Sequence, residues 1–349
     1  MTQNPGKIFV LYHRGLRTGG PEALHQLVDM LRELGQDAYL VAHPGTAHNA
    51  RVEQYAKYNA PEAPEIIDEA GNTVVCPETF LIELAAVKHA RRMCWWLSID
   101  NALTFMAARM WSRSTSGLVA KVMETAIPYG RMWKNNITPG RIRKDGAIVH
   151  LVQSSYAWAF TATRFDTVPS LVSDYTPTSE FQTADESVRN HNLVTYNPAK
   201  GGQIIEAVQA LCDPSIEWRP IQGMTREQVV ATLRECGVYL DLGHHPGKDR
   251  MPREAALSGA LTVVSRRGSG AFFADVPIPW GHKVTPGDGE ARSAAAMLPV
   301  LIKDLAAEVA KQDTYRRTIM QEREKFKREV EDVFVKGQLG KDAYDYAPI

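Results

Sequence analysis

CGVYLDLGHHPGKDRMPREAALSGALTVVSRRGSG, residues 236–270, holds two apolar runs separated by a polar loop and a segment of small residues. The apolar runs at 238–240 and 261–264 predict strands, and Glu254 with the small residues after it predicts a helix start. A loop that leaves the carboxyl end of a strand and enters a helix is where open α/β sheets bind ligands. Helix-start amides and cationic side chains favour a phosphate-bearing ligand. The stretch therefore predicts an α/β domain that binds a nucleotide diphosphate.

Strand and helix patterns alternate along most of the chain, which predicts parallel sheets covered by helices on both faces. One series begins with the apolar run at residues 7–13, and a second begins at residues 193–196. Between them, residues 168–187 contain two prolines and no strong periodicity, as expected of a linker. We therefore expect two Rossmann-like domains.

The composition of the 349 residues limits the classes of function. Forty basic and forty acidic residues give a formal net charge of zero, so no global field recruits nucleic acid. The four cysteines lie far apart and form no CxxC pair, which argues against a zinc site and a disulfide framework. No signal peptide and no apolar run of membrane-spanning length is evident, so we expect a cytoplasmic protein.

The arrangement of residues 236–270 resembles the donor-binding domain of GT-B glycosyltransferases, most closely the family 4-like enzymes of bacterial capsule and lipopolysaccharide synthesis. The resemblance implies two Rossmann-like domains that face a cleft, and it implies that Glu254 hydrogen-bonds the ribose of a sugar nucleotide. Eight positions earlier, where those enzymes carry a second acid that faces the donor sugar, this sequence has Pro246. The alternative for Glu254 is an acid of the first helical turn, favoured by the helix dipole. The expected domains are an acceptor-side domain at 1–180, a donor-binding domain at 181–320, and a C-terminal helix at 321–349 that crosses back to the first domain.

A second island of resemblance is YNPAKGG at residues 196–202, which ends the first strand of the second series. The resemblance implies that Lys200 pairs with the donor pyrophosphate, and Arg250 is the expected cationic partner. A solvated surface lysine is the alternative. The full set of expected donor-binding residues is Asn197, Lys200, Gly201, Lys248, Arg250, Arg253, Glu254, Gly268, Ser269 and Gly270.

The acceptor side is expected at the ends of the first strands. Gly19 and Gly20, followed by Glu22, form a Gly-rich turn that faces the cleft in GT-B enzymes, although such a turn also serves ordinary chain reversal. His13 and Asp100 each stand at a strand end. A histidine held by a carboxylate can act as a general base on a sugar hydroxyl, so we predict this pair as catalytic. The alternative is a helix-capping Asp100 and a structural His13.

Residues 109–144 carry many basic and aromatic side chains and a single acid, Glu124. This mixture suits an anionic membrane surface or a lipid-diphosphate acceptor, and we expect peripheral association with the inner face of the plasma membrane. A partly buried helix with a solvated basic face is the alternative. The basic residues are Arg109, Arg113, Lys121, Arg131, Lys134, Arg141, Arg143 and Lys144.

The sequence thus predicts a metal-independent glycosyltransferase that moves a sugar from a nucleotide diphosphate to a bacterial surface glycan or lipid-linked acceptor. It needs no cofactor besides this co-substrate. The resemblance favours retention of anomeric configuration, whereas a His13–Asp100 pair would favour inversion. The rival functions are a non-catalytic nucleotide- or glycan-binding subunit, motivated by Pro246, and a sugar-nucleotide epimerase or phosphorylase.

Overall fold

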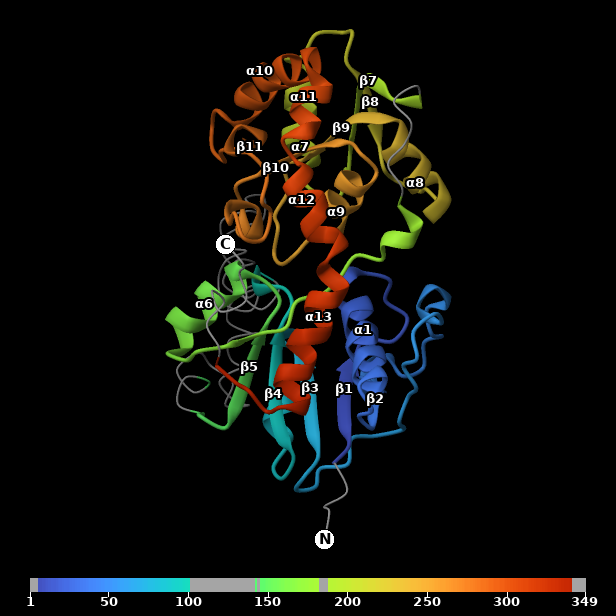
Figure 1. Ribbon diagram of the computed structural model, residues 1–349, viewed down its shortest axis with the longest axis vertical. Coiled ribbons are helices and arrows are strands. Elements are labelled where there is room, and N and C mark those ends of the chain that lie inside the picture. The colour runs from blue at the N-terminus through green and yellow to red at the C-terminus, as the bar shows by residue number, and fades with distance from the viewer. Residues whose placement is uncertain (1–5, 101–141, 143–144, 182–187, 341–349) are drawn as a thin grey trace, which may run out of the picture. The chain divides into compact units, whose positions relative to one another are not determined.

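The computed structural model describes residues 6–100, 142, 145–181 and 188–340 (Figure 1). The chain divides into two compact units. Unit 1 comprises Met1–Asp174 with Glu324–Ile349, and unit 2 comprises Tyr175–Arg323. Each unit is built on a parallel sheet with helices, so the predicted α/β class with two Rossmann-like sheets is confirmed.

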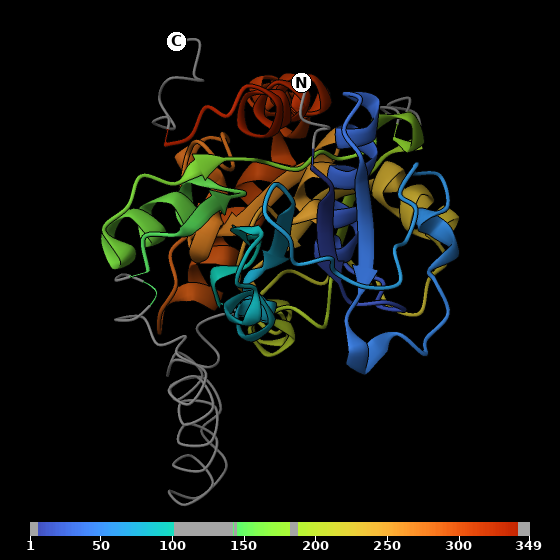
Figure 2. The same cartoon turned by 90° about the horizontal axis from the view of Figure 1, so that it is seen from below.

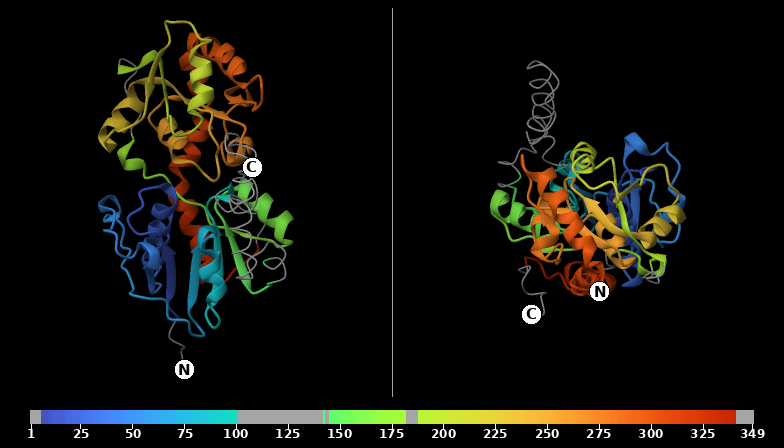
Figure 3. Two further views of the ribbon diagram at one scale, coloured as in Figure 1. Left: turned by 180° about the vertical axis from the view of Figure 1, so that it is seen from behind. Right: turned by 90° about the horizontal axis from the view of Figure 1, so that it is seen from above.

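Unit 1 contains a six-stranded sheet of order β2-β1-β3-β4-β5-β6, and all its strand pairs are parallel. The strands are β1 (Ile8–Tyr12), β2 (Ala38–Ala42), β3 (Thr73–Pro77), β4 (Arg91–Trp96), β5 (Ile148–Val152) and β6 (Ser170–Leu171). The helices are α1 (Gly19–Glu33), α2 (Leu81–Ala86) and α6 (Ser155–Phe165), with short turns η1 (Pro44–Thr46), η2 (Glu53–Tyr55) and η3 (Glu78–Phe80). Every residue of β1 is buried, as expected for a parallel strand covered on both faces. Strands β1 and β2 run side by side (Figures 1 and 2), and α1 and α2 cover opposite faces of the sheet (Figures 1 and 3).

The last helix, α13 (Glu322–Val330), is followed by a π-helical turn (Glu331–Val335), and from Glu324 onward it belongs to unit 1. Phe326 stacks on Trp95 of β4 with ring centroids 6.4 Å apart. The buried carboxylate of Glu329 accepts hydrogen bonds from the amide (2.7 Å) and hydroxyl (2.6 Å) of Ser173. These contacts make α13 part of the unit 1 core.

Unit 2 contains a five-stranded parallel sheet of order β11-β10-β9-β7-β8. The strands are β7 (Asn190–Tyr196), β8 (Glu217–Pro220), β9 (Cys236–Asp241), β10 (Leu261–Ser265) and β11 (Lys283–Val284). The helices are α7 (Gly202–Gln209), α8 (Arg226–Glu235), α9 (Arg250–Leu257), α10 (Glu290–Lys303), α11 (Leu305–Ala310) and α12 (Asp313–Met320), with short turns η5 (Thr178–Glu180), η7 (Gly268–Ala271) and η8 (Trp280–His282).

Strand β9 occupies the centre of the unit 2 sheet, and its side chains alternate between two cores. Val238 and Leu240 pack in the core that includes residues of α7 and α10, whereas Tyr239 packs in the core that includes residues of α9 and α12. The period of two residues is that of a strand with both faces covered. Helix α9 begins at Arg250, four residues before Glu254, where the sequence had suggested its start.

In the part of the chain that the structure describes, no helix combines the length and the apolar character needed to cross a membrane. The basic and aromatic segment at 109–144 lies outside the described residues, apart from the buried Ile142.

Candidate functional site

Three loops of unit 2 meet because β9 lies between β7 and β10 and all three strands are parallel. They are residues 197–201 after β7, 242–249 after β9 and 266–271 after β10. Glycines let the loops approach closely. A Cβ atom on Gly243 would lie 2.7 Å from Cβ of Lys200, and one on Gly270 would lie 2.3 Å from the Ser265 carbonyl oxygen. The sequence therefore brings these loops together at the edge where open α/β sheets bind ligands.

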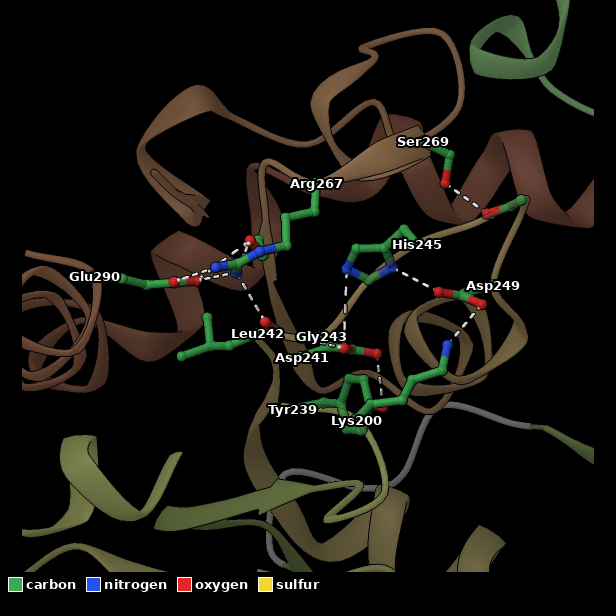
Figure 4. Close-up of polar contacts among 12 residues, drawn as sticks. Lys200, Tyr239, Asp241, Leu242, Gly243, His245, Asp249, Arg267, Ser269 and Glu290 are labelled. Atoms are coloured by element: carbon green, nitrogen blue, oxygen red, sulfur yellow. Dashed lines mark hydrogen bonds and ion pairs between the residues drawn. The ribbon is translucent and has the colours of Figure 1, made fainter. Parts of the chain in front are cut away.

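Lys200 is held at this edge by a carboxylate of the neighbouring loop. Its Nζ atom lies 2.7 Å from Oδ1 of Asp249, and Oδ2 of the same carboxylate lies 2.7 Å from Nδ1 of His245 (Figure 4). The Lys200 side chain is 30% exposed, whereas that of His245 is 1% exposed. Lys200 is thus the most exposed of these three side chains.

The other side of the His245 ring faces Asp241, the last residue of β9. Nε2 of His245 lies 3.8 Å from Oδ1 of Asp241, which also accepts a hydrogen bond from the Gly243 amide at 3.1 Å. Oδ2 of Asp241 accepts one from the Tyr239 hydroxyl at 3.2 Å. The imidazole therefore stands between two carboxylates.

Electrostatic interactions within this cluster set its protonation. Burial alone would raise the pKa of the Asp249 carboxyl, but Lys200 and His245 outweigh burial and hold that pKa at about 2. Burial disfavours the His245 imidazolium, yet Asp241 and Asp249 raise its pKa above the usual value. The pKa of Lys200 is also raised, because Asp249 and Asp241 outweigh its desolvation. The carboxylates accordingly favour the charged forms of Lys200 and His245, and these two cations favour the ionised form of Asp249.

Asp241, His245 and Asp249 are, within the described residues, the one group whose acidic and imidazole atoms are close enough to surround a metal ion, all within 4.8 Å. Asp249 is already paired with Lys200, whose positive charge opposes a second cation. The geometry is that of an ion-pair network, and independence from metal remains a prediction.

Two of the predicted donor-binding cations are instead engaged by Glu322, the first residue of α13. Lys248 donates to Oε1 of Glu322 at 2.9 Å, and Arg253 donates to Oε2 at 2.8 Å. The Arg253 side chain is 1% exposed, so burial keeps its guanidinium from a ligand. In this structure Arg253 ties the loop after β9 to Glu322, and its role in donor binding remains a prediction.

Glu254, the acid expected at the ribose, also has a partner within unit 2. Its carboxylate is 4% exposed and accepts two hydrogen bonds from Arg226 of α8, at 2.9 and 3.0 Å. Contact between Glu254 and a ribose remains a prediction. It requires that the Glu254 carboxylate either leave Arg226 or accept a further hydrogen bond from the ribose while it stays bound to Arg226.

The remaining predicted residues shape the loops. Asn197 accepts a hydrogen bond from the Ala199 amide at 3.0 Å, and Gly201, with φ of 72°, precedes α7. The Ser269 hydroxyl donates to the Gly247 carbonyl at 2.6 Å, which ties the loop after β10 to the loop after β9. Gly268 and Gly270 belong to the same turn, η7, and Arg250 begins α9.

In unit 1, the predicted His13–Asp100 pair does not form among the described residues. The His13 ring packs on Phe80 with centroids 4.5 Å apart, and Asp100 accepts a hydrogen bond from the Tyr156 hydroxyl at 2.8 Å. Sheet order explains the error, because β3 separates β1, which precedes His13, from β4, which leads to Asp100. Burial, assisted by the nearby His43, lowers the pKa of His13, so this ring favours the neutral form.

Among the described residues of unit 1, a histidine–carboxylate pair joins His43, after β2, to Glu83 of α2. His43 Nε2 lies 2.9 Å from Glu83 Oε1, and its Nδ1 accepts a hydrogen bond from the Gly45 amide at 3.1 Å. Both ring nitrogens are therefore engaged. Of the predicted acceptor-side residues, Gly19 and Gly20 begin α1, and Glu22 accepts a hydrogen bond from the Tyr58 hydroxyl at 2.7 Å.

Glu78 is a buried acid at the end of β3 that the sequence did not single out. It accepts a hydrogen bond from the Leu97 amide at 2.9 Å, and burial raises its pKa to about 7. The folded protein therefore binds this proton more tightly than the unfolded chain, so stability should fall as pH rises from 4.5 to about 7. A shift of this size corresponds to about 3 kcal/mol.

Replacement of Glu78 by glutamine should remove most of this pH-dependent loss. Urea unfolding at pH 4.5 and pH 8 measures the difference, with the exposed Glu69→Gln as the matched control. Equal pH dependence in Glu78→Gln and in the control would contradict the assignment of the raised pKa to Glu78.

The two parallel α/β units have the fold of GT-B glycosyltransferases. No protein-family model and no curated protein matches the sequence. Among solved structures, the chain is similar to a sucrose-phosphate synthase from Thermosynechococcus elongatus, with a TM-score of 0.65 and 12% identity over 95% of this chain and 98% of that one. It is also similar to Anabaena Alr3699/HepE in complex with UDP-glucose, with a TM-score of 0.60 and 13% identity over 95% and 99% of the two chains.

A third similar structure is WaaG, a glycosyltransferase involved in lipopolysaccharide biosynthesis, with a TM-score of 0.57 and 9% identity over 93% and 99% of the two chains. At sequence identities this low, the structural similarity shows a shared fold and nothing finer. The expected GT-B architecture is thereby confirmed at the level of the fold.

Proposed function

We propose that this chain is a metal-independent glycosyltransferase that takes a sugar from a nucleotide diphosphate. The proposal rests on the position of Lys200. The parallel pairing of β7 with β9 puts this lysine among three glycine-containing loops. The partly exposed side chain of Lys200 is paired with Asp249. An incoming diphosphate competes with the Asp249 carboxylate for the Lys200 ammonium group. The fold is shared with a protein that was solved with UDP-glucose, which supports UDP as the first nucleotide to try.

The chemistry follows from stabilisation of the leaving group. Breaking the bond between sugar and diphosphate adds negative charge to the diphosphate, and a pre-positioned cation in a partly desolvated site stabilises that charge. Lys200 supplies this cation, and no proton transfer through a metal-bound water is required. We further propose a bacterial surface glycan or lipid-linked acceptor and retention of configuration, on the resemblance to family 4-like enzymes.

A binding assay without added metal tests the proposal. UDP, GDP, CDP and dTDP are screened by thermal shift with EDTA present, and the hit is measured by calorimetry. A ligand at a hundred times its dissociation constant adds about 2.7 kcal/mol to the free energy of unfolding, enough for a shift of several degrees. We expect one nucleotide to shift the wild type, Lys200→Ala to lose the shift, and the exposed Lys303→Ala to keep it. No shift by any nucleotide would contradict the donor site.

The second candidate is a nucleotide-binding subunit without turnover. It is favoured by Pro246, where the resembled enzymes carry an acid, and by the engagement of Glu254 with Arg226. Binding of a nucleotide sugar without transfer to any acceptor and without hydrolysis supports this candidate over the enzyme.

A further inference from the structure

Arg267, which follows β10, is an additional cation at the edge formed by the three loops. Its Nη1 donates to the Leu242 carbonyl at 3.0 Å (Figure 4). The same Nη1 also donates to the Ser265 hydroxyl at 2.8 Å. Nη1 and Nη2 also bind the two oxygens of Glu290, the first residue of α10, and the Nη2 bond measures 2.6 Å. The Glu290 side chain is 4% exposed, so the acid is a fixed anchor for the guanidinium.

A guanidinium has two edges that can each bind two oxygens. Glu290 takes the edge formed by Nη1 and Nη2. The other edge consists of Nε and the outer hydrogen of Nη2, and Nε of Arg267 makes no hydrogen bond to any described residue. The Arg267 side chain is 19% exposed. A rigid fork of two donors matches the spacing of two phosphate oxygens.

The Arg267 guanidinium and Lys200 both lie next to the loop that follows β9. Arg267 binds the Leu242 carbonyl, and the next residue, Gly243, packs on Lys200, where an added Cβ would lie 2.7 Å from that of the lysine. The Arg267 guanidinium and the Cβ atom of Lys200 therefore both adjoin the peptide between Leu242 and Gly243, at the carboxyl end of β9. Each also forms a pair with a carboxylate, Asp249 for Lys200 and Glu290 for Arg267.

The adjacent arginine has a different environment. The Arg266 guanidinium stacks on Trp280 at 3.9 Å from the ring centroid and donates to the Thr285 hydroxyl at 2.8 Å. The two neighbours thus offer a matched comparison between an arginine of the loop edge and one held by Trp280.

We propose that Arg267 binds the diphosphate of the donor through its Nε/Nη2 edge, opposite Lys200, and that Glu290 is the residue that positions it. Arg267 thereby takes the role of second cation that the sequence had suggested for Arg250. This inference rests on the proposed function, because it requires a nucleoside diphosphate at Lys200.

The test compares UDP, UMP and uridine by calorimetry on the full chain, with another base if the nucleotide screen selects one. Arg267→Gln should weaken UDP binding by about 10–100-fold, the loss expected for charge-assisted hydrogen bonds. Uridine binding should stay within threefold of wild type. Arg266→Gln should change neither ligand by more than threefold. Arg267→Lys, which keeps the charge and loses the fork, should lie between wild type and Arg267→Gln, and Glu290→Gln should weaken UDP more than uridine.

The outcomes separate this inference from the proposed function. If Arg267→Gln binds UDP as wild type does while Lys200→Ala does not, Arg267 is not a diphosphate ligand and the proposed function stands. If Arg267→Gln and Arg267→Lys weaken UDP and uridine equally, Arg267 acts only through its contacts with Leu242 and Ser265, and the inference is overturned. If wild-type protein binds no nucleoside diphosphate, both proposals fail. Should Arg267→Gln lose its near-ultraviolet circular dichroism, Arg267→Lys decides the question alone.

Discussion

Replacement of Lys200 by methionine should lower the rate of sugar transfer by about 100- to 1,000-fold, the range found when one pre-positioned donor to a developing anion is removed. Methionine keeps much of the aliphatic stem and removes the charge. Asp249 then retains its contact with His245, so the loops should stay folded. The turnover number at saturating donor isolates the effect on the leaving diphosphate from the effect on binding.

Two controls define this result. Lys200→Arg keeps a positive charge at the same place and should recover part of the rate, whereas the exposed Lys303→Met should have wild-type turnover. A turnover number for Lys200→Met within threefold of wild type, with donor saturating, would show that this lysine does not stabilise the leaving group.

Replacement of Arg253 by methionine should lower the free energy of unfolding by about 3–5 kcal/mol, as expected when one partner of a buried ion pair is removed. Arg253 donates to Glu322 and also to the carbonyls of Lys248 and Asp249, at 2.9 and 3.2 Å. Methionine removes all of these bonds and leaves Glu322, which is 2% exposed, with fewer donors. Urea unfolding followed by circular dichroism measures the loss.

The matched control for Arg253 is an arginine–carboxylate pair at the surface of the same unit. Arg219 and Glu235 are bonded at 2.5 Å, but their side chains are 35% and 39% exposed. Solvent screens such a pair, so Arg219→Met should cost no more than about 1 kcal/mol. A loss for Arg253→Met no larger than that of Arg219→Met would contradict the structural role given to Arg253.

Much of the fold could be predicted from the sequence because it depends on local patterns. Apolar runs such as residues 238–240 and 261–264 are short, flanked by turn residues and separated by helical segments, and each became a buried parallel strand. Lys200 was placed at the donor site by the resemblance to GT-B enzymes, and the structure brings it to the loop after β9 because β7 pairs with β9.

The partners of the charged side chains could not be predicted, because they depend on strand order and on helix packing. Strand order separates His13 from Asp100 and brings β2, with His43, next to β1. Arg253 lies in α9, where residues 252–257 are all buried, and its partner Glu322 lies 69 residues away. Its sequence neighbours, Pro252 and Glu254, gave no local signal of this distant partner.

Unit 1 is assembled from two separate parts of the chain, and this has a consequence for synthesis on the ribosome. Thr176 donates its amide to Glu322 at 3.0 Å, which joins the two ends of unit 2, and every residue of that unit leaves the ribosome before Glu324 does. Unit 1 at that stage still lacks Phe326, which stacks on Trp95, and Glu329, which binds Ser173. Unit 1 is therefore the later of the two units to acquire its complete core, although most of it precedes unit 2 in the chain.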